Sequence, residues 1–244
     1  MKKTLLLSLF RRISPLFLLA FAPWARASII ANGSFENVSP ALATNGICTT
    51  NQTIYPSVSP GAYPACSATG WTGNYQIGNG KTIGVFGVSF GIPQPDPNGS
   101  NTLILQAERN VAPTATQSID LPTTGNYALS FYVANRSSPA ASSGPQTVSA
   151  LLDGSVISGG VYSNLPDAWT LETLDFNASG GTHTLTFEGL DEASGAATAN
   201  VSAFLDDASI SPVTTATPEP STLALLGLGL LAVAILTHRL TRTV

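Results

Sequence analysis

The feature that most constrains the fold of this chain is a series of short apolar runs with a two-residue period between residues 28 and 213. The clearest run, 126–135, alternates apolar with small or polar side chains, as a strand with one buried face requires. Turn-forming residues separate such runs roughly every 8–12 residues, and no stretch sustains the 3.6-residue apolar period of a helix. The pattern predicts an all-β fold, an antiparallel β-sandwich.

Five segments carry this strand pattern. One of them contains Asp153-Gly154 between two alternating runs, which is a strong signal for a tight β-hairpin. Another has two runs on either side of a Gly180-Gly181 turn. We therefore expect strands in each segment. The segments are 101–107, 126–135, 147–157, 169–190 and 201–213.

Charge is scarce, and most of the basic residues lie at the two ends of the chain. Only 10% of the residues are Asp, Glu, Lys or Arg, well below the roughly 25% of typical soluble domains. Nucleic-acid binding depends on Lys and Arg side chains that neutralise phosphates. The middle of the chain offers almost none, so we predict no nucleic-acid partner.

The N-terminus has the three parts of an export signal. A basic region is followed by the apolar run ISPLFLLAFAPW, and Ala25-Arg26-Ala27 supplies the small-x-small cleavage pattern. A retained membrane anchor is the alternative, but the placement of the cleavage pattern favours removal. We predict a signal peptide at 1–27 and a mature chain that begins at Ser28.

The chain contains two cysteines, Cys48 and Cys66. An isolated pair in an exported protein is expected to form a disulfide. Closing a loop of this size contributes roughly 3 kcal/mol in the chain-entropy model. A metal or redox site is the weaker alternative, because the spacing is not Cys-x-x-Cys.

The segment 221–237 is uncharged and mostly Leu, Ala, Gly, Val and Ile, and a basic stub follows it. It is slightly shorter than the ~20 residues of a comfortable transmembrane helix, and the stub fits a positive-inside flank. Pro220 suits the first position of a helix. A buried helix is the alternative by length alone. The context favours a single-pass C-terminal anchor, joined to the β domain at 28–213 by a linker at 214–217.

The same tail resembles the PEP-CTERM sorting signal, which is also catalogued as an ice-binding-protein C-terminal domain. TPEPSTLALLGLGLLAVAIL followed by basic residues matches its Pro-Glu-Pro, hydrophobic helix and basic end over residues 218–244. The resemblance implies that an exosortase, a membrane cysteine peptidase of Gram-negative bacteria that make exopolysaccharide, recognises Pro218, Glu219 and Pro220. It implies an exported protein held at the inner membrane before processing and then passed to the cell surface or extracellular matrix.

The β domain itself resembles galactose-binding-like jelly rolls, which include many carbohydrate-binding modules. The resemblance rests on IIANGSFEN (29–37), Gly70-Trp71 and FLDDASI (204–210). It implies a jelly-roll-like sandwich whose first and last strands lie close together, and a role in binding glycans such as exopolysaccharide. It also implies a structural calcium, for which the candidate ligands by position are Glu36, Asp206 and Asp207. The alternative is that these acids cap turns and face solvent.

Sugar sites combine aromatic faces with a few polar groups. Tyr132 is expected to face outward because it alternates with Phe131 and Val133. Together with Tyr75 and Tyr162 it forms our candidate ligand site, whereas Trp71 and Trp169 are expected to pack in the core.

No catalytic motif stands out in the sequence. His183 follows a tight turn and is expected to be an exposed strand histidine, and no Gly-x-Ser-x-Gly elbow or Walker loop is present. We therefore predict a non-enzymatic, carbohydrate-binding protein. Two alternatives stay open: a structural surface or matrix protein without a specific ligand, and a secreted hydrolase that uses a carboxylate pair.

Overall fold

The computed structural model describes residues 28–41, 46–50, 63–79, 91–107, 111–136, 146–190, 201–213 and 220–241. The predicted signal peptide at 1–27, the linker at 214–217 and the motif residues Pro218 and Glu219 lie outside these ranges.

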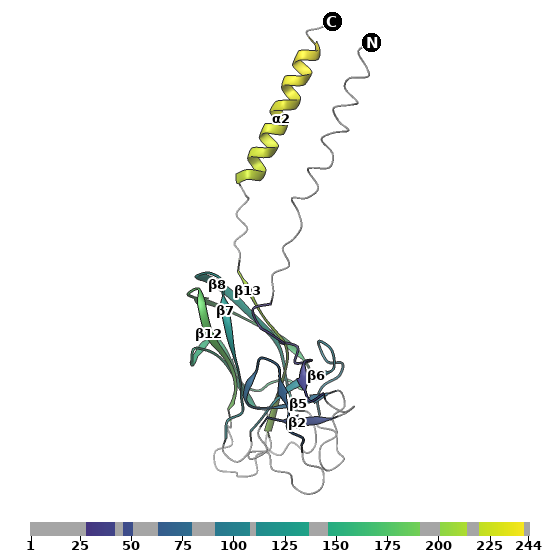
Figure 1. Cartoon of the computed structure of the whole chain (residues 1–244), viewed down its shortest axis with the longest axis vertical. Coiled ribbons are helices and arrows are strands. Elements are labelled where there is room, and N and C mark those ends of the chain that lie inside the picture. Colours follow the sequence, from purple (N-terminus) through teal and green to yellow (C-terminus); the bar gives the residue numbers. More distant parts are fainter. Residues whose placement is uncertain are drawn as a thin grey trace.

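The β domain consists of two antiparallel sheets that face each other, with a two-stranded sheet beside them. In Figure 1, β12 and β7 lie on one side of the domain and β6, β5 and β2 on the other. The five-stranded sheet has the order β10(Ser155–Tyr162), β9(Thr147–Leu152), β12(Gly181–Leu190), β7(Thr114–Leu121), β4(Thr72–Asn74). The six-stranded sheet has the order β11(Thr170–Ala178), β8(Gly125–Asn135), β13(Val201–Pro212), β6(Asn101–Ala107), β5(Gln76–Asn79), β2(Ile47–Thr49). The small sheet pairs β1(Val38–Ser39) with β3(Ser67–Ala68).

The main core lies between the two large sheets. Alternate residues of the central strands enter it, so the inward face of β8 is buried while its other face is half-buried. Phe131 of β8 meets Phe187 of β12 edge-on, with ring centroids 5.0 Å apart. Trp71 extends this aromatic contact, because its ring lies 6.0 Å from Phe187 and 5.2 Å from Phe35. The all-β sandwich and the core position of Trp71 are thus confirmed.

The five predicted segments all contain strands, but two features were not predicted. The runs on either side of Gly180-Gly181 form β11 and β12, which belong to different sheets. Strand β7, which lies between β12 and β4 in the five-stranded sheet, was missed. Its inward positions are Ala115, Gln117, Ile119 and Leu121. A small and a polar residue among them hide the apolar alternation.

The Asp153-Gly154 hairpin is confirmed. Both residues have positive φ (51° and 78°), which is the conformation that a type I′ turn needs to match the twist of the paired strands. The turn joins β9 to β10 at the edge of the five-stranded sheet, and Ser155 pairs directly with Leu152.

Residues 28–37, the N-terminal segment, pack against the end of the chain's last strand. The Ala208 N–H of β13 donates to the Gly33 carbonyl (2.9 Å). Gln117 of β7 holds the same segment, because its Oε1 accepts from Ala31 N–H and its Nε2 donates to the Ala31 carbonyl, both at 2.8 Å. Phe35, fully buried, completes the contact with the core. The N-terminal segment therefore lies beside β13, whereas the first strand, β1, pairs with β3.

The predicted disulfide is also confirmed. Cys48 of β2 and Cys66 are bonded, with Cα atoms 5.7 Å apart, and both side chains are buried. The bridge ties the outer strand of the six-stranded sheet to the segment that leads into β3.

The C-terminal helix α2 runs from Pro220 to Thr241 and covers the predicted helix at 221–237. Pro220 is its first residue, as expected from the missing N–H of proline. Among the described residues, no helix is long and apolar enough to cross a membrane, so the structure gives the predicted membrane span no support.

Candidate functional site

The outer face of the six-stranded sheet, opposite the main core, carries a second and smaller apolar cluster. On β6 and β13 alternate side chains point to this face, and Ile104 and Phe204 are fully buried there in direct register. Tyr63 and Trp169 pack against them. The indole N–H of Trp169 donates to the Pro93 carbonyl (3.0 Å). Trp169 is therefore partly buried on the outer face, rather than in the core where it was expected.

Beside these rings lies a group of buried polar residues, here called the polar patch: Gln76, Gln106, Arg136 and Ser202. Their exposed fractions are 0%, 4%, 5% and 1%. Ser202 of β13 is in register with Gln106 of β6, and Arg136 N–H donates to the Ser202 carbonyl (3.2 Å). Gln76 of β5 is in register with Ile104, two residues along β6 from Gln106. The patch therefore crosses three neighbouring strands, β5, β6 and β13, and includes the residue that follows β8.

Two members of the polar patch are buried without a partner among the described residues. Neither Nε2 nor Oε1 of Gln76 makes a hydrogen bond there, and neither does Oγ of Ser202. A buried polar group that loses its partner costs about 1–3 kcal/mol. By contrast, Gln117 is similarly buried but uses both ends of its amide. The polar patch thus holds unused donors and acceptors close to aromatic rings.

The charge on the polar patch comes from Arg136. Burial lowers the pKa of this guanidinium, and the nearby Tyr63 hydroxyl acts in the opposite direction. Arginine remains charged in proteins and presents five N–H donors. The polar patch therefore combines amide, hydroxyl and guanidinium groups on one face of the sheet.

The polar patch was not predicted from the sequence. The available signal was a glutamine between apolar or aromatic neighbours: Tyr75 and Ile77 for Gln76, and Leu105 and Ala107 for Gln106. A strand buried on both faces reads as a continuous apolar run, so a polar residue inside such a run marks an unusual outer face.

The three candidate tyrosines do not form one site. Tyr75 is fully buried in the main core, its hydroxyl donates to the Trp71 carbonyl (3.1 Å), and it also accepts from Ala68 N–H (3.1 Å). The assignment of Tyr75 to a ligand site was therefore wrong, because its side chain points into the main core. Its neighbour Gln76 points outward.

Tyr132 and Tyr162 lie in different sheets. Tyr132 of β8 is half-buried on the outer face, in register with Asp206 and Leu171. Tyr162 of β10 packs edge-on against Phe131, with centroids 5.6 Å apart, and burial raises its pKa to about 12. Of the predicted ligand residues, Tyr132 alone shares the face of the polar patch.

The three candidate calcium ligands lie near one another with a fourth acid, Asp96; together they are here called the acidic cluster (Glu36, Asp96, Asp206, Asp207). Asp206 is fully buried on the outer face of β13. Its Oδ2 accepts from Asn98 N–H (3.2 Å) and its Oδ1 from Asp207 N–H (2.7 Å). A bulge in β13 follows, with Asp207 at φ 50°. The cluster therefore joins the N-terminal segment, residues 91–100 and β13.

Glu36 holds the chain just before β6. Its Oε1 accepts from Ser100 N–H (2.7 Å) and Asn101 N–H (2.6 Å). Gly99 has φ 86°, and a Cβ at this position would overlap the Glu36 carboxylate. Glycine is thus required for the chain to pass around this side chain.

Burial and neighbouring negative charges disfavour ionisation of two acids of the cluster, Asp206 and Asp96. The pKa of Asp206 rises to about 8, mainly through burial, with Asp96 and Asp207 adding repulsion. The pKa of Asp96 rises to about 6, again mainly through burial. Calcium prefers such oxygen ligands, but within the described ranges no three acidic, histidine or cysteine side chains are arranged to hold a metal ion. Here Glu36 and Asp206 accept hydrogen bonds from backbone N–H groups. Asp96 and Asp207 accept them from side chains. Calcium binding stays a prediction.

His183 lies in an arrangement that resembles a serine–histidine–aspartate triad. Its Nδ1 is 2.7 Å from Asp153 Oδ2, and its Nε2 is 3.4 Å from Ser179 Oγ. Nε2 lies closer to the Ser179 carbonyl oxygen, at 3.0 Å. This contact is a hydrogen bond when Nε2 carries a hydrogen, but it is repulsive when Nε2 presents a lone pair. A general base needs that lone pair for the serine hydroxyl, so the geometry describes a structural link between two turns.

We expect the pKa of His183, measured by NMR, to lie above its ordinary value, because the Asp153 carboxylate and then the Ser179 carbonyl stabilise the imidazolium. The associated stability is present below the pKa of the unfolded state, about 6.5, and is lost as pH rises through the higher folded-state pKa. Asp153→Asn should lower the pKa toward the ordinary value. An unchanged value in that variant would contradict the link.

The tail can now be compared with known sequences. Residues 216–239 match the model of the PEP-CTERM protein-sorting motif. This chain carries a PEP-CTERM sorting motif. The match includes Pro220, the first residue of α2, and ends within that helix. The PEP-CTERM motif covers the tail alone and assigns nothing to the β domain. No curated protein shows significant similarity to the full sequence.

Several solved carbohydrate-binding modules are similar to the chain in structure. TmCBM61 in complex with beta-1,4-galactotriose is 11% identical, with a TM-score of 0.43 and coverage of 77% of this chain and 99% of that one. The CBM22-1 xylan-binding domain of Paenibacillus barcinonensis Xyn10C is 15% identical, with a TM-score of 0.39 and coverage of 62% of this chain and 90% of that one. A family 35 carbohydrate-binding module from Clostridium thermocellum is 12% identical, with a TM-score of 0.36 and coverage of 50% of this chain and 86% of that one. At TM-scores this low the likenesses assign no ligand to this chain.

Proposed function

We propose that this protein is exported, processed at its PEP-CTERM motif by an exosortase, and binds a glycan on the outer face of the six-stranded sheet. The motif supports the sorting part of the proposal. The polar patch and the rings of Tyr63 and Trp169 support the binding part. Exopolysaccharide at the cell surface is the glycan we favour, because sorting would deliver the β domain there.

The observation that carries the binding proposal is the Gln76 amide. This side chain is fully buried on a sheet face away from the core, with no partner for either end among the described residues. A sugar hydroxyl both donates and accepts, so it can satisfy the NH₂ and the carbonyl oxygen of an amide. Aromatic rings beside such groups pack against the apolar surfaces of sugar rings.

The two alternative functions lack comparable support. A hydrolase needs a pair of carboxylates free to act on a substrate, but the carboxylate of Asp206, the acid with the most perturbed pKa, already accepts hydrogen bonds from Asn98 N–H and Asp207 N–H. A purely structural protein gains nothing from an unused buried amide, because that amide lowers stability.

Gln76→Met is expected to stabilise the protein while weakening glycan binding about tenfold or more. Methionine is similar in size and needs no hydrogen bond, so the change removes a cost of about 1–3 kcal/mol. The matched change Gln117→Met should destabilise by about the same amount, because it breaks both hydrogen bonds to Ala31. Chemical denaturation of the full-length protein in detergent measures both effects.

Binding is measured by calorimetric titration with soluble exopolysaccharide fragments, beta-1,4-galactotriose and xylo-oligosaccharides. The proposal predicts saturable binding to at least one of these glycans by the natural protein. Equal affinity in Gln76→Met would show that the polar patch is not the binding site. A loss of stability in Gln76→Met as large as that in Gln117→Met would show that the Gln76 amide is already satisfied.

A further inference from the structure

A pocket of about 750 Å³ lies at the end of the sandwich where the described β domain begins and ends. Ser28, the first residue of the predicted mature chain, and Pro212, the last residue of β13, both line it. We call it the exit pocket. Its lining includes Ser28, Ile29, Pro122, Thr123, Ile210 and Pro212.

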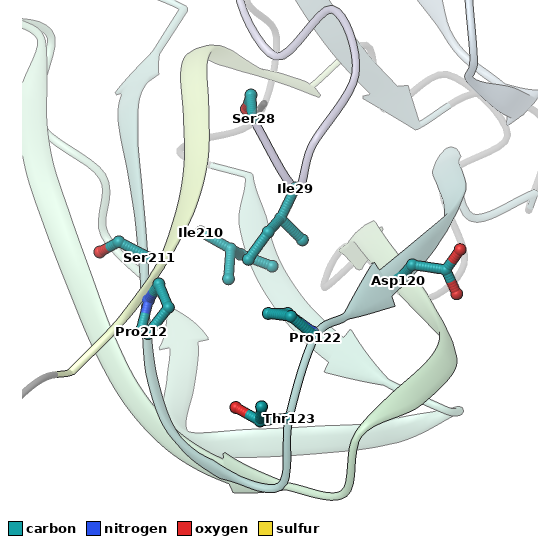
Figure 2. Close-up of a pocket in the computed structure, with 8 residues that line it drawn as sticks. All are labelled: Ser28, Ile29, Asp120, Pro122, Thr123, Ile210, Ser211 and Pro212. Atoms are coloured by element: carbon teal, nitrogen blue, oxygen red, sulfur yellow. The ribbon is translucent and has the colours of Figure 1, made fainter. Parts of the chain in front are cut away.

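The middle of the exit pocket is apolar. Figure 2 shows the side chains of Ile29, Pro122 and Ile210 directed toward one another. Asp120, the acid in the lining, is directed away from them, and its Oδ1 accepts from the Thr182 hydroxyl (2.7 Å). The pocket therefore offers apolar contacts to a partner, and its carboxylate is engaged elsewhere.

The sorting motif is tethered close to this pocket. Val213 N–H donates to the Asn126 carbonyl (2.8 Å), which fixes the chain to β8 immediately after Pro212. The PEP-CTERM match starts at residue 216, and Pro218 is five residues beyond Val213. A fully extended chain spans at most about 3.6 Å per residue, so Pro218 lies within about 18 Å of Val213.

This short tether limits where a processing enzyme can stand. A folded domain of 100 residues already has a radius of gyration of about 13 Å. An enzyme with Pro218 in its active site must therefore approach this end of the β domain. The apolar pocket lies within the area that such an enzyme would cover.

We propose that the exit pocket is a docking site for the exosortase that processes the tail, and that it receives an uncharged apolar group of that enzyme. The inference rests on the proposed sorting function. It adds that the β domain takes part in recognition alongside the Pro-Glu-Pro motif. An acidic side chain placed in the pocket should oppose docking, because burying an unpaired charge is costly.

The test follows tail removal from the full chain in an exosortase-positive host. Pro122→Glu and Thr123→Glu each place a carboxylate on an exposed position of the pocket, and each should slow processing on the order of tenfold. Val161→Glu is the matched control, because Val161 is half exposed and lies far from the pocket. Across the sheet, Val161 pairs with Ser149, Ser149 with Glu188, and Glu188 with Thr114. Thr114 is at the opposite end of β7 from Leu121, the residue that precedes Pro122 of the pocket. This variant should be processed at the normal rate.

Folding of each variant is checked by the resistance of its β domain to limited proteolysis. If Pro122→Glu fails this check, Thr123→Glu carries the test. Normal processing of folded pocket variants would overturn the docking proposal. The proposal would also be overturned if the pocket variants lost binding to protein-free phosphatidylethanolamine/phosphatidylglycerol vesicles to the same extent as they lost processing. That result would identify lipid as the occupant of the exit pocket.

A separate variant, Pro218→Ala with Pro220→Ala, distinguishes docking from sorting. If its tail is still removed, the sorting proposal itself fails. If its tail is retained while the pocket variants are processed normally, the docking proposal alone fails.

Discussion

Gly33→Ala is expected to destabilise the β domain by about 3 kcal/mol or more. A Cβ at Gly33 would overlap the carbonyl oxygen of Ala208 and lie 2.9 Å from its carbonyl carbon. Both groups belong to backbone, so no side chain can rotate away. The N-terminal segment would have to move off β13, with loss of the Ala208–Gly33 hydrogen bond and of the contacts that bury Phe35.

The control for this change is Gly125→Ala at the start of β8. An added Cβ there meets nothing within 4 Å, so the same substitution should alter stability by less than about 0.5 kcal/mol. Denaturant unfolding of the two full-length variants makes the comparison. Similar stabilities would show that the N-terminal segment is not held against β13 as described.

The second large effect is a loss of stability as pH rises from about 4 to about 8, caused by Asp206. Its folded-state pKa of about 8 lies above the ordinary value of 3.8, so over this interval the folded state binds more protons than the unfolded state. Stability therefore falls with rising pH, by at most about 6 kcal/mol for a shift of this size. Asp206→Asn carries no charge and should lose this slope.

Asp175→Asn removes one exposed carboxylate and serves as the control for the pH series. A slope that survives in Asp206→Asn would contradict the assignment. The same series tests calcium. Binding at Glu36, Asp206 and Asp207 requires ionised carboxylates, so millimolar calcium should raise the melting temperature more at pH 8 than at pH 5. A melting temperature that does not change with calcium at either pH would contradict calcium binding. The acidic cluster would then have a structural role alone.

The sequence predicted those parts of the fold whose inward residues are strongly apolar. Strand β8 and the Asp153-Gly154 hairpin are examples, because their alternation and turn chemistry are local signals. Strand β7 was not predicted because the polar residue Gln117 occupies one of its inward positions. The Gln117 amide forms hydrogen bonds with the backbone of Ala31, which is 86 positions away in the sequence. A single-sequence pattern carries no information on such a partner.

The candidate site was less accessible to sequence reasoning for a similar reason. Tyr132 could be placed on the outer face by alternation within its own strand. Gln76 and Ser202 come together only through the order of β5, β6 and β13 in the sheet, which local patterns do not fix. Tyr75 was misplaced because it lies between two short strands, β4 and β5, and strands of so few residues give too little alternation to tell the two faces apart.

The most direct test of the account is titration of the same oligosaccharide panel into the natural protein and into Gln76→Met. The account predicts saturable binding by the natural protein and binding at least about tenfold weaker by the more stable variant. Equal binding by both proteins, or no binding by the natural protein to any glycan of the panel, would contradict a glycan site at the polar patch.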